Sequence, residues 1–78
     1  MAQKPSVGRI VLVPADPKLN NGADVAPAVI TRVWHDTLVN VRVLLDSNEA
    51  PVWRTSVVQV DDLNDNSGHV WAWPSRVA

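Results

Sequence analysis

The sequence predicts an all-β protein, and three features of its 78 residues carry this prediction. Fifteen residues are valine, which is stiff at χ1 and suits a pleated sheet better than a helix. Valines recur two or four positions apart, as at Val39, Val41 and Val43, and this spacing matches the period of a strand. Clusters of Pro, Gly, Asn and Asp separate these runs, as turns between strands do.

A long loop separates the first two predicted strands. Residues 7–13 form the first run, and residues 14–24 form the loop because they hold two prolines, two asparagines and a glycine. A loop of about ten residues exceeds the usual hairpin connection, which makes it a candidate functional loop. The second run, 25–34, contains Pro27, and this residue places the start of the run at a sheet edge or a bulge.

Three further runs complete the predicted sheet. A short turn at 35–37 leads into the third run, 38–45, and a turn at 46–49 leads through Pro51 into a fourth run that ends at Val60. The polar stretch 61–68 is a loop with room for one helical turn, because Asp favours helix starts. The last run, 69–73, stops at Pro74.

Alternation along the second and third runs assigns their residues to two faces. The valine-rich faces, which we expect to form the core, consist of Val25, Pro27, Val29, Thr31 and Val33 in the second run and of Val39, Val41, Val43 and Leu45 in the third. The opposite faces carry Ala26, Ala28, Ile30, Arg32 and Trp34, and Leu38, Asn40, Arg42 and Leu44.

Five short strands in fewer than 80 residues indicate a small barrel, which removes free sheet edges by curling. We expect an SH3-like barrel, with an OB-like barrel as the alternative. The single domain should span residues 7–74, with a flexible N-terminus at 1–6 and a short tail at 75–78. A chain of this size without cysteine would be marginally stable alone, so we expect a homo-oligomer.

Composition excludes several classes of protein. Hydrophobic residues make up 46% and charged residues 19%, which excludes an intrinsically disordered chain. The formal net charge of −1 provides no overall positive field, so polymeric nucleic acid is not an expected partner. No apolar run reaches the ~18–20 residues of a membrane span, and the N-terminus lacks the apolar core of a signal peptide. We therefore expect a cytoplasmic protein with no membrane partner.

The predicted strands bring arginine, tryptophan and histidine side chains together on one face. In the last run three of these side chains alternate onto one side, and in the second and third runs they lie opposite the valines. Tryptophan stacks on planar groups, and arginine offers a fork of donors to phosphate or carboxylate. The candidate ligand-binding residues are Arg32, Trp34, Arg42, His69, Trp71 and Trp73.

Other roles for these residues stay open. The chain has four tryptophans and no Phe or Tyr, so some of the tryptophans must fill the core, and Trp53 between Val52 and Thr55 is the strongest candidate. An exposed tryptophan pair can equally form a subunit interface. The two face arginines can instead pair with Asp36, Asp46 or Asp61 on neighbouring strands.

No catalytic, metal-binding or cofactor motif is found in the chain. His35 and Asp36 are adjacent, so on a strand they would point to opposite faces, and Ser67 and His69 have no third partner. The acidic stretch 61–68 resembles a calcium loop, but Ala72 stands where that loop requires Glu. We therefore expect neither an enzyme nor a bound metal or cofactor.

Three short segments resemble a group of small uncharacterised proteins encoded by bacteriophages and prophages, mostly of actinobacteria. They are VGRIV at 7–11, AVITRV at 28–33 and GHVWAWP at 68–74. In that group the chain typically closes on Gly-x-Trp-His-Trp-Pro, whereas here Ala72 replaces the His and an extra residue precedes Trp71. The resemblance implies a compact β fold and a phage accessory protein of the host cytoplasm. It gives no activity that can be carried over to this chain.

Two functions follow from the predicted face. The first is a non-catalytic binding protein that sequesters a small anionic or nucleotide-like ligand. The second is an interaction or assembly component, in which the same face contacts another subunit or a host protein.

Overall fold

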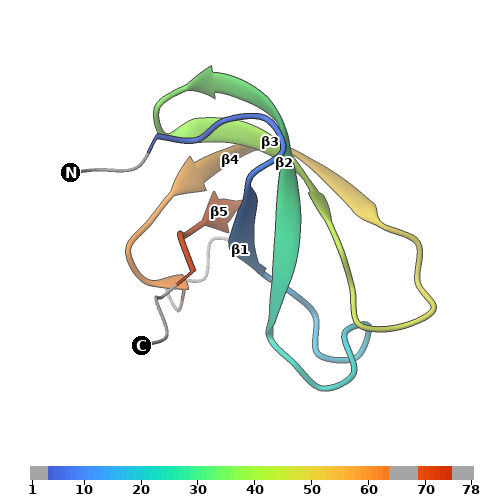
Figure 1. Ribbon diagram of the computed structural model, residues 1–78. Helices are drawn as coiled ribbons and strands as arrows, with labels where there is room; N and C mark the ends of the chain where they lie inside the picture. Colours follow the sequence, from blue (N-terminus) through green and yellow to red (C-terminus); the bar gives the residue numbers. More distant parts are fainter. Residues whose placement is uncertain (1–3, 64–68, 75–78) are drawn as a thin grey trace.

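Five strands form one sheet that curls into a nearly closed barrel in the computed structural model, which describes residues 4–63 and 69–74 (Figure 1). The strands are β1 (Ile10–Pro14), β2 (Val25–His35), β3 (Leu38–Val43), β4 (Val52–Gln59) and β5 (Val70–Trp71). The all-β prediction is confirmed, and each expected run overlaps one strand, with β1 and β2 each extending one residue past the end of its run. Strands β1, β3, β4 and β5 are shorter than the first, third, fourth and last predicted runs, because residues at the ends of those runs lie in loops.

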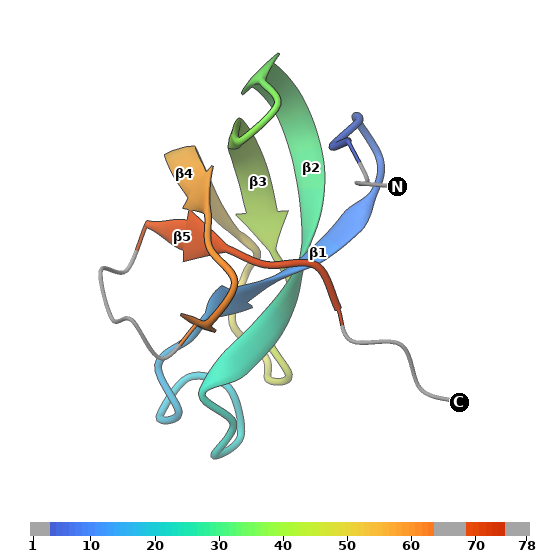
Figure 2. The ribbon, with the colours of Figure 1, turned by 90° about the vertical axis from the view of Figure 1, so that its left-hand side faces the viewer.

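Strand β5 closes the barrel between β4 and β1 (Figure 2). Strands β1 to β4 form an antiparallel meander, and β5 pairs in parallel with the end of β4 through Val58–Val70 and Gln59–Trp71. The main chains of Leu12 and Ala72 exchange two hydrogen bonds, both of 2.9 Å, which join β5 to β1. The strand order follows the chain order in one nearly closed sheet, which is consistent with the expected small SH3-like or OB-like barrel.

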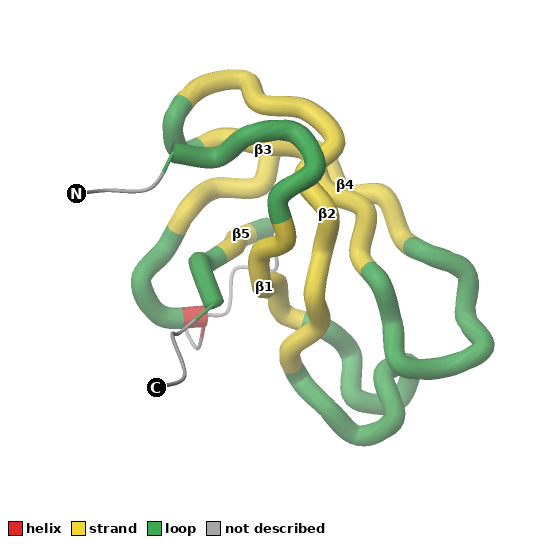
Figure 3. The backbone as a smooth tube through the Cα atoms, in the orientation of Figure 1, coloured by secondary structure: helices red, strands yellow, loops and turns green. Residues whose placement is uncertain are grey.

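The long strand β2 carries two register shifts that bend it around the barrel (Figure 3). Between Ile30 and Arg32, and again between Val33 and His35, β2 uses one more residue than β3. Such β-bulges bend a strand and increase its twist. They let β2 pair with β1 through its first half and with β3 along most of its length.

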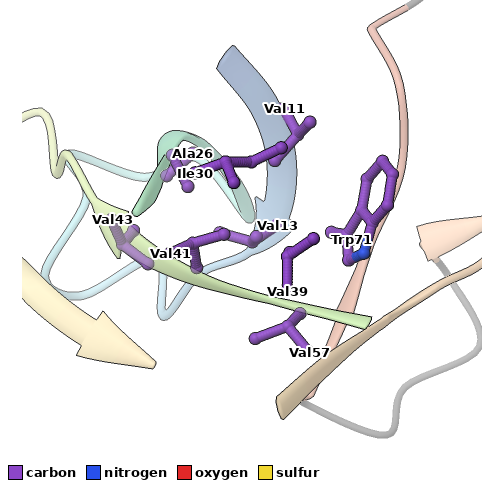
Figure 4. Packing of buried hydrophobic residues seen from close by; sticks show 10 residues of the cluster. Val11, Val13, Ala26, Ile30, Val39, Val41, Val43, Val57 and Trp71 are labelled. Carbon is purple, nitrogen blue, oxygen red and sulfur yellow. The ribbon is translucent and has the colours of Figure 1, made fainter. Parts of the chain in front are cut away.

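Within residues 4–63 and 69–74, ten buried residues pack into one hydrophobic cluster, and Trp71 is the largest of them (Figure 4). They are Val11, Val13, Ala26, Ala28, Ile30, Val39, Val41, Val43, Val57 and Trp71. The expected core face of the third run is confirmed at Val39, Val41 and Val43, which are completely buried.

The expected core face of the second run is wrong before the bulge that follows Ile30. Ala26, Ala28 and Ile30 are completely buried, whereas Pro27 is exposed. The register places Ala28 opposite Val11 and Ala26 opposite Val13, so small residues of β2 face buried valines of β1. The inside of a small barrel alternates small and large side chains in this way. Beyond the first bulge Val33 returns to the core side, where it packs against the buried cluster.

The loop 15–24 is held against the loop after β3 by one buried side chain. The Asn20 Nδ2 donates to the carbonyls of Ala23 and Val25, both at 3.0 Å, and its Oδ1 accepts from the backbone N–H of Asp46 at 2.7 Å. The Ser47 hydroxyl also donates to the Leu19 carbonyl. The long first loop is therefore fixed at one end of the barrel.

Three expectations lie wholly or partly outside the described residues. They concern the start of the flexible N-terminus, most of the acidic loop 61–68 and the tail 75–78. Within residues 4–63 and 69–74, no helix has the length and apolar character needed to cross a bilayer.

Candidate functional site

One row of side chains crosses the outer surface of the sheet from β1 to β4. The register sets Ile10 opposite Val29, Val29 opposite Arg42, and Arg42 opposite Trp53. Residues opposite each other on antiparallel strands point to the same side of the sheet. Ile10 is 46% exposed and Trp53 is 53% exposed, so this side faces solvent.

A second group, formed by Arg32, Trp34 and Asn40, lies beside this row. Arg32 is opposite Asn40, and the bulge at Trp34 brings its indole Nε1 to 2.9 Å from the Asn40 Oδ1. The Arg32 guanidinium lies over the Trp34 ring, 4.0 Å from its centroid, which is a close cation–π contact. Trp34 remains 48% exposed.

Asn40 holds this group in place although it lies on the outer side of the sheet. Its Oδ1 accepts hydrogen bonds from the Trp34 Nε1, the Thr55 hydroxyl and the Ser56 backbone N–H, each at 2.9 Å. Ser56 has a φ of 56°, at the point where β4 shifts register against β3. One buried oxygen therefore fixes both the Trp34 indole and the bulge of β4.

We define the Arg/Trp face as the four outward side chains Arg32, Trp34, Arg42 and Trp53. The Arg/Trp face carries positive charge, because no Asp or Glu occurs in any of the five strands. Every acidic residue in the described part of the chain lies in a loop or turn. Within residues 4–63 and 69–74, no ion pair joins the two arginines of the face to Asp36, Asp46 or Asp61, so the expected pairing is wrong.

Arg54, in β4, is the third arginine that lies in a strand. It was not among the predicted site residues, and it has a structural role. It is opposite Val41, so it points to the inner side, where its Nη1 donates to the Pro14 carbonyl at 2.7 Å. Burial lowers the pKa of Arg54 from its usual value, and a guanidinium stays charged at any physiological pH. Arg54 thus spans the gap between β4 and β1 that β5 is too short to close.

The predicted exposure of Trp71 is wrong, and so is the predicted burial of Trp53. Trp71 is completely buried, and its Nε1 donates to the Thr37 carbonyl at 3.2 Å. Trp53 faces solvent because it is opposite Arg42 on the outer row. Alternation in the fourth run could not have shown this, because the charged Arg54 shares the inner side with Val52.

The remaining predicted residues of the last run lie away from the Arg/Trp face. Trp73 is partly buried and packs edge-on against Trp71, with ring centroids 5.1 Å apart, and the Arg9 guanidinium lies 5.1 Å from the Trp73 centroid. His69 is exposed, and its carbonyl accepts from the Val58 N–H beside the end of β4. The strand register therefore places Arg32, Trp34 and Arg42 on one outward side together with Trp53, whereas Trp71 and Trp73 pack against each other elsewhere.

The turn at 35–37 shows no catalytic arrangement in the described part of the chain. The His35 Nδ1 lies 3.4 Å from the Thr37 backbone nitrogen and 3.3 Å from its hydroxyl, so the ring contacts Thr37. Within residues 4–63 and 69–74, no three His, Asp or Glu side chains gather to hold a metal ion.

Comparison of the chain with models of protein families, with curated proteins and with solved structures gives no match. The geometry and charge of the Arg/Trp face are therefore the basis for inferring a function.

Proposed function

We propose that the protein is a non-catalytic binding module, and that its Arg/Trp face binds an anionic ligand that contains a planar group. The supporting observation is that strands without any acidic residue carry two arginines and two half-exposed tryptophans on one outward side. Such a module fits the phage accessory role that the sequence resemblance implies.

The side chains of the Arg/Trp face suit such a ligand chemically. The exposed Trp53 ring can stack on a base or another planar group, and Arg42 directly opposite it can donate two hydrogen bonds to a phosphate. Arg32 stacks on Trp34, which orders its guanidinium before any ligand arrives. Preorganised side chains lose less conformational entropy on binding, so affinity rises.

The proposal is tested by titrating the protein with mononucleotides and short oligonucleotides while following tryptophan fluorescence. We expect the emission to change on binding, and Trp53→Leu to weaken binding at least about five-fold, because base–aromatic stacking contributes about 1–3 kcal/mol per base. Val58→Ala is the matched control, since Val58 is also an exposed residue of β4 but lies outside the Arg/Trp face. Unchanged emission with every compound would contradict the proposal.

The second candidate is an assembly component, and the apolar residues around the Arg/Trp face favour it. Ile10 is 46% exposed, and Leu44 is 40% exposed. Exposed apolar patches mark interaction sites, and Trp and Arg are frequent interface anchors. In this case Ile10→Thr should lower the mass measured by light scattering, and nucleotide titrations should show no change in emission.

A further inference from the structure

We infer that the ligand of the Arg/Trp face is a single-stranded nucleic acid that engages at least two nucleotides, rather than a free nucleotide. This inference rests on the proposed function and specifies its ligand. It follows from the spacing of the two tryptophans, the placement of the two arginines and the position of the face on the outside of the barrel.

The two tryptophans stand too far apart for one base. Trp34 belongs to β2 and Trp53 to β4, with β3 between them. Neighbouring strands lie about 4.8 Å apart, and Trp34 lies beside Leu38 and Val39, three to four residues along β3 from the position opposite Trp53. The two backbones are therefore separated by roughly 15 Å. A single base stacks on one ring only. The Arg32 guanidinium covers one face of the Trp34 ring, so a second base stacks on the other face of that ring or on the guanidinium itself. A ligand that uses both tryptophan positions must therefore carry two planar groups joined by a linker.

The two arginines lie where the linker of such a ligand would pass. Arg42 is on β3, between the two tryptophan strands, and Arg32 is opposite Asn40, two residues further along β3. One strand spacing and two residues of rise separate the two backbones by about 8 Å. Each guanidinium can therefore meet a phosphate of its own, as a polynucleotide backbone provides. A mononucleotide leaves one arginine and one tryptophan unused.

The shape of the surface also favours a chain over a small molecule. Small-molecule sites are concave and cover most of the ligand, whereas the Arg/Trp face lies on the outside of the barrel. Proteins that bind single strands combine cationic side chains with exposed rings on which successive bases stack. A duplex hides the faces of its bases, so only a single strand can use both rings.

The net charge of −1 does not oppose this ligand, because the charges are segregated. The described residues extend over 35 Å, and the acidic residues lie in the loops and turns. Charges more than about 10 Å apart are largely screened at 0.1 M salt, so acids at the far end of the barrel weakly affect this face. Asp36, in the turn after Trp34, is the acid nearest to the face along the chain.

The test compares thymidine monophosphate with the thymidylate tetramer by fluorescence titration of the full chain. A tetramer offers a one-base site about four alternative positions, so a gain in affinity above about four-fold requires contact with two nucleotides. We expect a gain of ten-fold or more. Two phosphate contacts on a single strand also predict a loss of affinity of about seven-fold between 50 and 200 mM salt.

Four substitutions connect the result to the Arg/Trp face. Trp53→Leu and Arg32→Gln should each reduce the advantage of the tetramer over the monophosphate to about four-fold or less. Lys18→Gln is the control for charge, because Lys18 is exposed in the loop 15–24, away from the sheet. It should leave that advantage above four-fold. Asp36→Asn should tighten tetramer binding, since it removes the acid nearest to the face.

The outcomes separate this inference from the proposed function. If the monophosphate binds within about four-fold of the tetramer and both respond to Trp53→Leu, the inference is wrong and the proposed function stands. If a DNA duplex binds as tightly as the tetramer, single-strand stacking is wrong. If neither probe binds, both proposals fail. If Trp53→Leu then lowers the mass measured by light scattering, the Arg/Trp face is a protein interface.

Discussion

Asn40 connects the conformation of two strands to the orientation of a surface tryptophan. Alternation in the third run correctly placed this residue on the side opposite Val39 and Val41. It could not show that Asn40 is only 6% exposed, because the side chains that cover it come from β2 and β4. The periodicity of one sequence predicts on which side of a strand a residue lies, but it does not predict which residues of other strands contact it.

We predict that Asn40→Ala destabilises the protein by about 2–4 kcal/mol in urea unfolding. The change leaves the Trp34 Nε1, the Thr55 hydroxyl and the Ser56 N–H without their shared acceptor, and unpaired buried donors are costly. Asn48→Ala, at an exposed loop position, should change stability by less than about 0.5 kcal/mol. An Asn40→Ala protein as stable as the Asn48→Ala protein would show that Asn40 does not hold the bulge.

At the scale of whole strands, the sequence predicted all five elements and misplaced the faces of two. One continuous alternation cannot fit the second run, because the extra residue at the bulge after Ile30 reverses the sides. The expected sides are therefore right after the bulge and wrong before it. The last run fails for another reason. Val70, Trp71 and Ala72 are all buried, so β5 has no solvent face that alternation could identify. No pattern in the chain signals that a two-residue strand closes the barrel.

A pair of tryptophan substitutions tests this arrangement of strands. We predict that Trp71→Ala lowers the free energy of unfolding by about 3–5 kcal/mol, because it removes the largest core side chain and its bond to Thr37. Trp53→Ala should cost less than about 1 kcal/mol, since that ring is 53% exposed. Thermal and urea unfolding of the two variants measure the difference. Similar losses from both would mean that Trp53, as the sequence suggested, belongs to the core.

At the scale of the molecule, the fold places basic and acidic residues in different regions of the surface, whereas composition gives only their total charge. Seven basic and eight acidic residues give a net charge of −1, which on its own argues against an anionic partner. The strand register then collects Arg32 and Arg42 on one outer side, while the described acids stay in loops and turns. Strand pairing fixes this pattern, so it could not be predicted before the register was known.

A charge exchange shows whether the local or the net charge controls binding. Arg42→Glu changes the net charge to −3, and adding Glu49→Lys in the exposed loop after β3 restores it to −1. We predict that the double variant still fails to bind the thymidylate tetramer at 50 mM salt, because a positive charge in that loop cannot replace the guanidinium opposite Trp53. Lys18→Glu, which also changes the net charge to −3, should bind within about three-fold of the original protein. If tetramer affinity instead follows the net charge in all three variants, binding is nonspecific attraction and the Arg/Trp face has no special part in it.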